Sequence, residues 1–390
     1  MEAAPGAGFE WVSENKEAAR AARKEMTFAG LPVIEAITRF DTEGLSGVTF
    51  SFYNRGDAGT MKREEFEALL ARITTTVNTG LGSIATPRPR DPTSAVNAEG
   101  VFWDKADRRF LLEWSSQREI KGRDQPFRAE FVRLNVSPNP TTASSATPPR
   151  NQRAVSGATP LENVERTPEG DTRLRSVPMV DQGQKGYCVT ASVERVLRYY
   201  GAAVDQHELA QIGNSDADEG TSSEAMLDAL RKLTGRLGVR VNEFYDLDFK
   251  SFLGMTEDYN RVAKRQKSPE LNVPTSGMID ISQIYGQMKG EILLEARMKS
   301  RSDYGKFQRE LGRQIDQGYP LLWSVMLGLV PETPALPQAR GGHMRLIIGY
   351  NTEKNELLYT DSWGAGHELK RMPMDSAWAI TTGLSTLVPL

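Results

Sequence analysis

The hydrophobic positions of this chain change their period along the sequence, and each period predicts a different kind of element. In residues 9–134, the β-rich runs "TFAGLPVIEAITRF" and "GVTFSFYN" flank the turn-like "DTEGLSG", and "GVFW" with "RFLLEW" predicts a second hairpin. Between the two hairpins, apolar residues recur at helical spacing. This stripe comprises Phe66, Leu69, Leu70, Ile73 and Val77. The pattern therefore predicts an α+β domain over residues 1–136, an antiparallel sheet with one helix packed across it.

The hydrophobic pattern is lost from Ser137 onward. The segment "SPNPTTASSATPPRNQRAVSGATP" is rich in Pro, Ser and Thr, and no aromatic residue lies between Phe131 and Tyr187. Such a segment buries too little apolar surface to offset the entropy lost on ordering. We therefore expect residues 137–175 to form a linker, or a strap lying on the surface.

Residues 176–390 regain a globular pattern in which helices precede strands. A helix from Cys188 to Tyr200 is followed by Gly201, and "TSSE", with Thr221 and Glu224 as a capping box, precedes the predicted helix "AMLDALRKL". The run "DFKSFLGMTEDYNRVAKRQK" predicts a further helix. The runs "YPLLWSVML", "HMRLIIGY" and "ELLYTD" then predict strands, with "NTEKN" turning between the last two. This order predicts a second α+β domain.

The composition of the chain gives no support for a nucleic-acid partner or for a membrane-spanning segment. A net charge of −3 gives no argument for a nucleic-acid partner, and no apolar run approaches the about 20 residues that span a bilayer. The start, "MEAAPGAGFEW", lacks the basic and apolar regions of a signal peptide. We expect either a cytoplasmic protein or a chain whose signal has been removed. The small residues after Met1 slightly favour the extracytoplasmic alternative.

The chain contains a single cysteine, Cys188, at the first turn of a predicted helix. A thiolate is the reactive form of cysteine, and the partial positive charge of a helix N-terminus favours it. Gly183 and Gly186 allow the preceding backbone to fold tightly against the helix. Cys188 is therefore the candidate nucleophile. A lone cysteine in an apolar helix is, by itself, more often a small buried hydrophobic residue.

A nucleophilic thiol needs a base, and the chain has three histidines. His207 lies in the polar run "DQHELAQ", which predicts a surface helix, and His367 lies on a predicted edge strand. His343 follows two glycines and opens the strand "HMRLIIGY", so it is the preferred base. Asp361 ends the next strand, where a hairpin would place it beside the imidazole to fix its tautomer. Trp363 can cover that hydrogen bond, although a lone tryptophan is more often a core residue.

Attack on a carbonyl also needs donors for the oxyanion, each worth about 3 kcal/mol. The Cys188 backbone N–H and the Gln182 side-chain amide are the candidates. Gln182 by itself is more often an ordinary loop amide. These residues predict nucleophilic catalysis on a peptide or protein substrate, with no metal or organic cofactor needed.

Three motifs carry a resemblance to papain-like cysteine peptidases. Gln182-Gly183-x-x-Gly186-x-Cys188 resembles their glutamine-to-cysteine segment, "GGHMRLIIGY" their Gly-His strand, and "DSWG" their Asn-Ser-Trp-Gly. The interval of 155 positions between Cys188 and His343 is close to the roughly 130–150 expected. The resemblance implies a Cys-His-Asp triad that acts through an acyl-enzyme.

Two details resemble the bacteriocin-processing, double-glycine-leader branch of these peptidases. Val189 stands where papain-like enzymes proper carry Trp, and Asp361 stands in place of Asn. The resemblance covers residues 176–255 and 303–375. It therefore implies a peptidase domain over 176–390 with a helical insertion near 256–302.

Two alternatives concern the N-terminal domain. In one, the papain-like part is catalytically silent and serves as a scaffold, with residues 1–136 as the interaction module. In the other, the chain is a zymogen, because a long polar linker directly precedes the catalytic block. Residues 1–136 would then restrain the cleft or recruit substrate.

Overall fold

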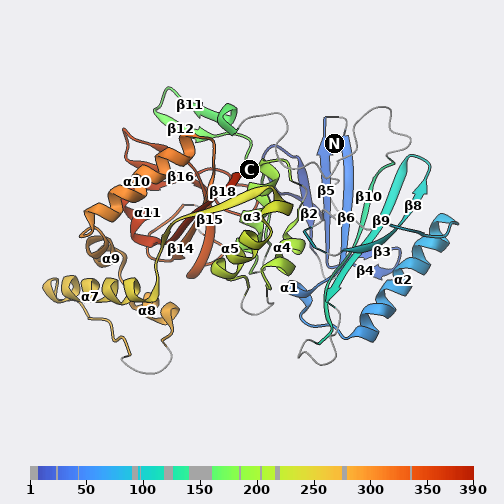
Figure 1. Ribbon diagram of the computed structural model, residues 1–390, viewed down its shortest axis with the longest axis horizontal. Helices are drawn as coiled ribbons and strands as arrows, with labels where there is room; N and C mark the ends of the chain where they lie inside the picture. The colour runs from blue at the N-terminus through green and yellow to red at the C-terminus, as the bar shows by residue number, and fades with distance from the viewer. Residues whose placement is uncertain are drawn as a thin grey trace. The chain divides into compact units, whose positions relative to one another are not determined.

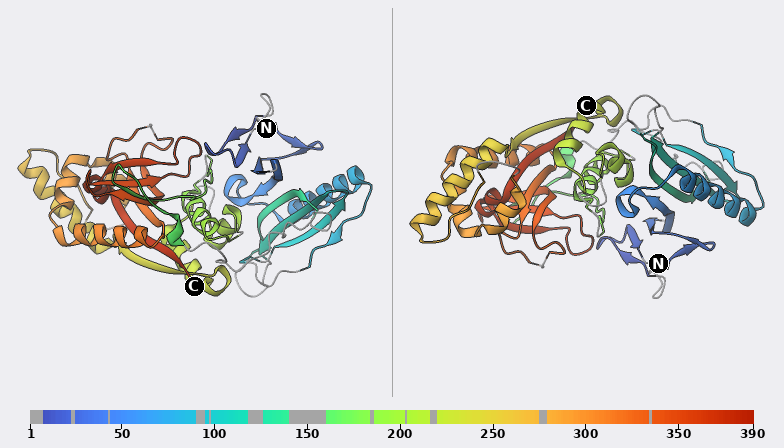
Figure 2. Two further views of the ribbon diagram at one scale, coloured as in Figure 1. Left: turned by 90° about the horizontal axis from the view of Figure 1, so that it is seen from above. Right: turned by 90° about the horizontal axis from the view of Figure 1, so that it is seen from below.

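The computed structural model describes most of the chain, in two compact units (Figures 1 and 2). The first unit comprises Met1–Arg153, Met179–Glu194 and Ala202–Leu237, and the second comprises Ala154–Pro178, Arg195–Gly201 and Gly238–Leu390. The described residues are 8–22, 25–42, 44–89, 95–96, 98–117, 126–139, 160–183, 186–202, 204–215, 220–274, 279–333 and 336–390.

The first unit contains an antiparallel sheet, which has eight strands within the described residues. In spatial order the strands are β1 (Glu10–Trp11), β2 (Ala18–Ala21), β5 (Glu35–Asp41), β6 (Gly44–Asn54), β10 (Arg128–Pro138), β9 (Arg108–Gln117), β8 (Glu99–Lys105) and β7 (Thr86–Pro87). The hairpins β5–β6 and β8–β9 are the two that the sequence predicts. A separate small ribbon pairs β3 (Thr27–Phe28) with β4 (Leu31–Pro32).

Helix α2 (Arg63–Leu81) packs against this sheet (Figure 1). Its buried residues are Phe66, Ile73 and Val77, three members of the predicted apolar stripe. They pack with buried Trp103 on β8 and with core residues of β9 and β10. The expected sheet with one helix across it is therefore confirmed.

The described residues of the first unit also form four short helices and the first part of a longer one. They are α1 (Arg55–Ala58), α4 (Gln206–Ile212), α5 (Ser223–Lys232), α6 (Thr234–Leu237) and the first part of α3 (Cys188–Tyr199). Asp205 caps α4 by accepting from the His207 and Glu208 N–H groups, and Ser222 caps α5.

The second unit is built on another antiparallel sheet, in which the long strand β15 (Gly341–Asn351) has three partners. β14 and then β12 pair with one edge of β15, and β16 pairs with the other. The other strands are β11 (Val164–Arg166), β12 (Asp171–Leu174), β13 (Val239–Asp246), β14 (Leu321–Leu327), β16 (Glu356–Thr360), β17 (Lys370–Pro373) and β18 (Thr381–Pro389). Helices α10 (Arg301–Asp316) and α11 (Met374–Ile380) contact it. The α+β class is thus confirmed.

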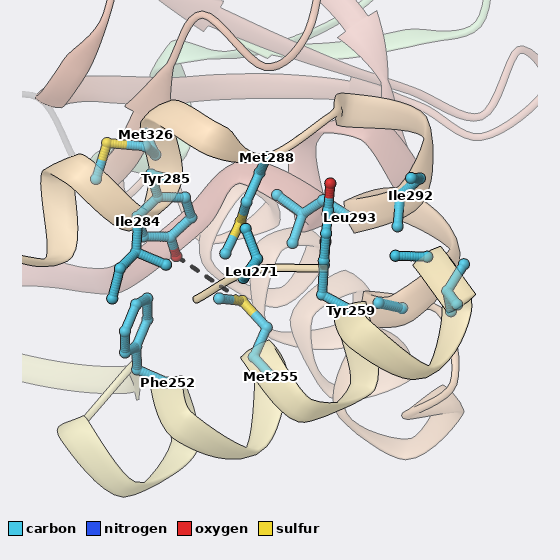
Figure 3. Packing of buried hydrophobic residues seen from close by; sticks show 13 residues of the cluster. Phe252, Met255, Tyr259, Leu271, Ile284, Tyr285, Met288, Ile292, Leu293 and Met326 are labelled. Carbon is cyan, nitrogen blue, oxygen red and sulfur yellow. Dashed lines mark hydrogen bonds between the residues drawn. The ribbon is translucent and has the colours of Figure 1, made fainter. Parts of the chain in front are cut away.

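Residues 256–302 are largely helical and have an apolar core of their own (Figure 3). Helices α7 (Phe249–Arg265), α8 (Ile281–Gln287) and α9 (Gly290–Arg297) contribute most of it, and Met326 of β14 joins them. Tyr259 and Tyr285 lie within this core, and the Tyr259 hydroxyl accepts from the Lys289 N–H at 2.8 Å. That this stretch is an insertion stays a prediction.

Residues 140–159 of the expected linker lie outside the described residues. Its later part, 160–174, forms a short 3-10 helix (Pro160–Asn163) and the hairpin β11–β12. β12 joins the large sheet by pairing Arg173 with Gly349 of β15. The segment contains little apolar surface, so hydrogen bonds hold it in place instead. Buried Asp171 accepts hydrogen bonds from Asn351 and Arg371.

Candidate active site

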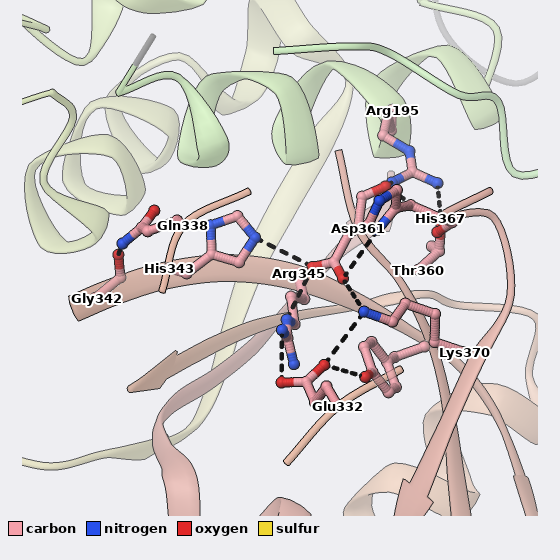
Figure 4. A network of polar contacts seen from close by, with 11 residues as sticks. Arg195, Glu332, Gln338, Gly342, His343, Arg345, Thr360, Asp361, His367 and Lys370 are labelled. Atoms are coloured by element: carbon pink, nitrogen blue, oxygen red, sulfur yellow. Dashed lines mark hydrogen bonds and ion pairs between the residues drawn. The ribbon is translucent and has the colours of Figure 1, made fainter. Parts of the chain in front are cut away.

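His343 and Asp361 lie together at one end of the β15–β16 hairpin (Figure 4). His343 is the third residue of β15, opposite Val325, and Asp361 directly follows β16. The His343 Nε2 atom is 3.1 Å from Asp361 Oδ1, and both side chains are fully buried. In the neutral imidazole this contact places the proton on Nε2, so that Nδ1 is the basic nitrogen.

Trp363 lies flat on the His343 ring. The two ring centroids are 4.2 Å apart and the planes differ by 4°, which is a stacked arrangement. The stack limits rotation of the imidazole and covers one of its faces. The structure thus places Trp363 where the sequence expected a shield for the His343–Asp361 contact.

Asp361 is surrounded by positive charge. Arg345 Nε is 2.8 Å from Asp361 Oδ1, and Lys370 Nζ is 3.3 Å from Oδ2. Burial alone would raise the pKa of Asp361. The hydrogen bond from His343 and the charges of Arg345 and Lys370 instead hold that pKa well below its usual range. Asp361 is therefore a carboxylate throughout the neutral range.

A second buried acid, Glu332, balances these cations. It contacts Arg345 Nη2 at 2.9 Å and Lys370 Nζ at 3.3 Å, and it also accepts from the Tyr359 hydroxyl. Two acidic and two basic side chains therefore share one buried network, with Asp361 as the member that reaches the imidazole. Such a network holds its side chains in fixed positions, because water cannot reach these buried charges to replace a lost partner.

Arg195 holds the backbone at the end of β16. Its guanidinium donates to the Asp361 carbonyl, the Thr360 hydroxyl and the Pro178 carbonyl, each at 2.7 Å. Burial lowers the pKa of Arg195 to about 10, which still leaves it charged at neutral pH. These hydrogen bonds fix the backbone at Thr360 and Asp361, where the turn after β16 begins.

Sequence reasoning missed Arg195, Glu332, Arg345 and Lys370. One signal was available: Arg345 lies two positions after His343 in a strand, so both side chains point to the same face. A charged residue on that face, within an otherwise apolar run, indicates a buried partner for the acid near His343.

In the first unit, the candidate nucleophile is the first residue of its helix. α3 begins at Cys188, whose side chain is partly exposed, while Gln182 is buried. Gly183 has φ +68°, a left-handed conformation that favours glycine. A Cβ on Gly186 would lie 2.7 Å from the Gly220 Cα, so the backbone there requires glycine. The glycines thus have the tight-backbone role that the sequence predicts.

The other two histidines differ from the sequence expectations. The surface assignment of His207 is wrong: it is buried, its Nε2 is 3.4 Å from Glu35 Oε2, and its ring meets the Tyr187 ring edge-on. His367 lies between β16 and β17 and on neither strand, with Nδ1 4.0 Å from Asp361 Oδ2. Burial lowers the pKa of His367, which favours its neutral form.

The lowered pKa of Asp361 predicts an acid-dependent loss of stability. A carboxyl whose folded pKa is depressed stabilises the fold above its unfolded pKa of about 3.9, and this contribution falls as pH falls through the folded pKa. The free energy of unfolding of the wild type should therefore exceed that of Asp361→Asn at pH 7, and the difference should shrink from pH 4 downward. Urea unfolding of both proteins at pH 7, 5, 4 and 3 measures it. A difference that stays constant with pH would contradict the assignment.

Among the described residues, no group of three or more His, Cys, Asp or Glu side chains is arranged to hold a metal ion. Within the same residues, every helix is too short or too polar to cross a membrane. The expectation that no metal or cofactor is needed stays a prediction.

A comparison with known protein families bears on the part of the chain that contains His343 and Asp361. Residues 251–386 match the model of the Peptidase_C39 like family. The chain is a cysteine peptidase, and the matched segment belongs to the C39-like family. That segment contains His343 and Asp361, whereas Cys188 and Gln182 precede it. The predicted resemblance to C39-like cysteine peptidases is confirmed for this segment, and the role of the glutamine-to-cysteine motif stays a prediction.

Other similarities are weaker. No curated protein matches the chain. Among solved structures, xylellain, a cysteine protease from Xylella fastidiosa, is similar at 11% identity and a TM-score of 0.28, over 63% of this chain and 94% of that one. This similarity is too low to equate individual residues of the two proteins.

Proposed function

We propose that the chain hydrolyses peptide bonds through a triad of Cys188, His343 and Asp361, with a covalent acyl-enzyme intermediate. The observation that carries the proposal is the buried His343–Asp361 contact of 3.1 Å beneath the stacked Trp363. The only cysteine of the chain, at the first residue of α3, supports it. The family match supports the reaction class.

The proposed reaction begins with proton transfer from the Cys188 thiol to His343 Nδ1. The thiolate then attacks the scissile carbonyl carbon, and the Cys188 N–H and the Gln182 amide stabilise the oxyanion. His343 returns the proton to the departing amine as the C–N bond breaks, which leaves a thioester on Cys188. Water, deprotonated by His343, attacks this thioester, and the carboxylic acid leaves as the thiol is restored.

The buried charge network explains how Asp361 serves this cycle. Arg345 and Lys370 keep it ionised and fixed, so it accepts from Nε2 in both protonation states of His343. Glu332 and Asp361 together match the charges of Arg345 and Lys370, which limits the positive charge beside the imidazolium. Asp361 thus orients His343 and stabilises its charged form without taking a proton.

A positional-scanning library of fluorogenic peptides tests the proposal, with Cys188→Ala as the matched control. The wild type should cleave a subset of the library and the variant none. An acid-quenched reaction with a peptide ester should also show, by intact-mass spectrometry, an acyl adduct on Cys188. Neither cleavage nor adduct in the wild type would contradict the proposal and would favour a catalytically silent scaffold.

A further inference from the structure

We infer that the N-terminal sheet is a positioning element of the peptidase site, because it anchors both ends of the segment 181–188. This inference rests on the proposed function, in which Gln182 and Cys188 supply the oxyanion donors. The anchors are Asn54 with Gly56 at one end of the segment and Arg20 at the other. All of these residues lie in the first unit.

The first anchor holds Tyr187, the residue immediately before Cys188. Tyr187 is 1% exposed, and its hydroxyl donates to Asn54 Oδ1 at 2.6 Å. Asn54 is the last residue of β6 and caps α1, since the same oxygen accepts from the Gly56 N–H at 3.0 Å. A Cβ on Gly56 would lie 2.0 Å from the Tyr187 hydroxyl oxygen. The first turn of α1 is therefore shaped to receive the tyrosine.

The second anchor holds the turn at Gln182. Arg20 of β2 bonds Glu35 through Nε at 2.5 Å and lies 3.5 Å from Asp181 Oδ2 through Nη1. Asp181 Oδ1 accepts from the Gly183 N–H at 2.8 Å, which closes the backbone around Gln182. A Cβ on Gly183 would lie 2.4 Å from Arg20 Nη2. The guanidinium thus packs directly against the turn.

Buried polar contacts connect the two anchors to each other and hold helix α4 against the N-terminal sheet. Glu35, 1% exposed, contacts both Arg20 and His207, and the His207 ring meets Tyr187. Helix α4, which carries His207, is held by Arg133 of β10 through Glu208 at 2.6 Å. These groups are costly to separate, since each would be left buried without its partner. A region attached in this way differs from a pro-segment that is removed on activation.

The expected consequence concerns the rate of the chemical step. Oxyanion donors act only when aimed within a fraction of an ångström, and a displacement of about 1 Å can cost about 10²-fold in rate. Loosening either anchor should therefore lower kcat and change KM little. A domain that only recruits substrate would show the opposite division, with KM raised and kcat retained.

The test compares Tyr187→Phe with Tyr259→Phe in the full chain. Tyr259 is a matched control: it is also buried, and its hydroxyl accepts from the Lys289 N–H at 2.8 Å, within the helical core of the second unit. Tyr187→Phe should lower kcat about 10-fold, because one lost hydrogen bond lets the oxyanion donors move out of alignment, with KM within about 2-fold. Tyr259→Phe should keep the wild-type kcat while losing similar thermal stability.

A second pair of variants tests the space at α1. Gly56→Ala would place a Cβ onto the Tyr187 hydroxyl, so it should lower kcat more than Tyr187→Phe does. Gly80→Ala is the control: its Cβ meets no atom within 4 Å, and its kcat should equal that of the wild type. Wild-type kcat in both Tyr187→Phe and Gly56→Ala, or an equal loss in Tyr259→Phe, would overturn the inference while the proposed function stands. A wild type that cleaves no peptide, and whose Cys188 reacts no faster than a free cysteine, would overturn both the inference and the proposed function.

Discussion

Cys188→Ala is expected to lower kcat/KM for peptide cleavage by about 10⁶-fold, because the variant has no atom to form the acyl bond. Cys188→Ser should be nearly as inactive, since a hydroxyl in this position is far less acidic than a thiol. Rates on the best library peptide measure both variants. Because Cys188 is the only cysteine, thiol labelling followed by intact mass confirms its absence directly.

The thermal stability of these variants shows whether activity is lost because the nucleophile is missing or because the protein has unfolded. Cys188 is partly exposed at the start of α3, so replacing its sulfur should change the thermal midpoint by only a few degrees. A Cys188→Ala protein that folds normally and keeps activity within tenfold of the wild type would remove Cys188 from the mechanism.

His343→Gln should produce the second large loss, about 10⁴-fold in kcat/KM. Glutamine can still donate to Asp361 and fill much of the space beneath Trp363, but it cannot accept the thiol proton at neutral pH. The loss should therefore appear mainly in kcat, as expected when proton transfer in the transition state is removed.

His367→Gln is the matched control for His343→Gln. Both histidines are buried and face the same carboxylate, but His367 Nδ1 is 4.0 Å from Asp361 whereas His343 Nε2 is 3.1 Å away. His367→Gln should retain activity within a few-fold. If His367→Gln were the inactive variant and His343→Gln the active one, the base would have to be reassigned.

The elements that the sequence predicts well are those set by local, periodic patterns. The α2 stripe around Phe66, Ile73 and Val77 and the hairpin β15–β16 both follow from residues close in the chain. That hairpin was enough to bring His343 and Asp361 together. The triad that includes Cys188 stays a prediction.

The buried charges could not be found in this way. Glu332 lies 13 positions before Arg345 and 38 before Lys370, in the Pro-rich run "VPETPALPQAR", which has no periodic pattern. Composition treats each of these residues as a solvated surface charge. Only their mutual pairing makes burial favourable, and pairing between distant residues leaves no local signal.

The same physics explains the error at His207. Its helix, "DQHELAQ", is short and mainly polar, which predicts exposure. The contact of His207 with Glu35 and the ion pair of Glu208 with Arg133 add to the few apolar contacts that so short a helix makes. For the same reason, the change of composition near Ser137 gave no indication that residues 181–188 and α4 are attached to the N-terminal sheet.

The most direct measurement of the central claim is the pH dependence of Cys188 alkylation by iodoacetamide, in the wild type and in His343→Gln. An ordinary thiol with a pKa of about 8.5 loses about 10²-fold in reactivity between pH 8 and pH 6. If Cys188 is held as a thiolate beside His343, the wild-type rate should fall only a few-fold over that interval, while the rate of His343→Gln falls about 10²-fold. A wild-type rate that falls as steeply as that of the variant would contradict the account.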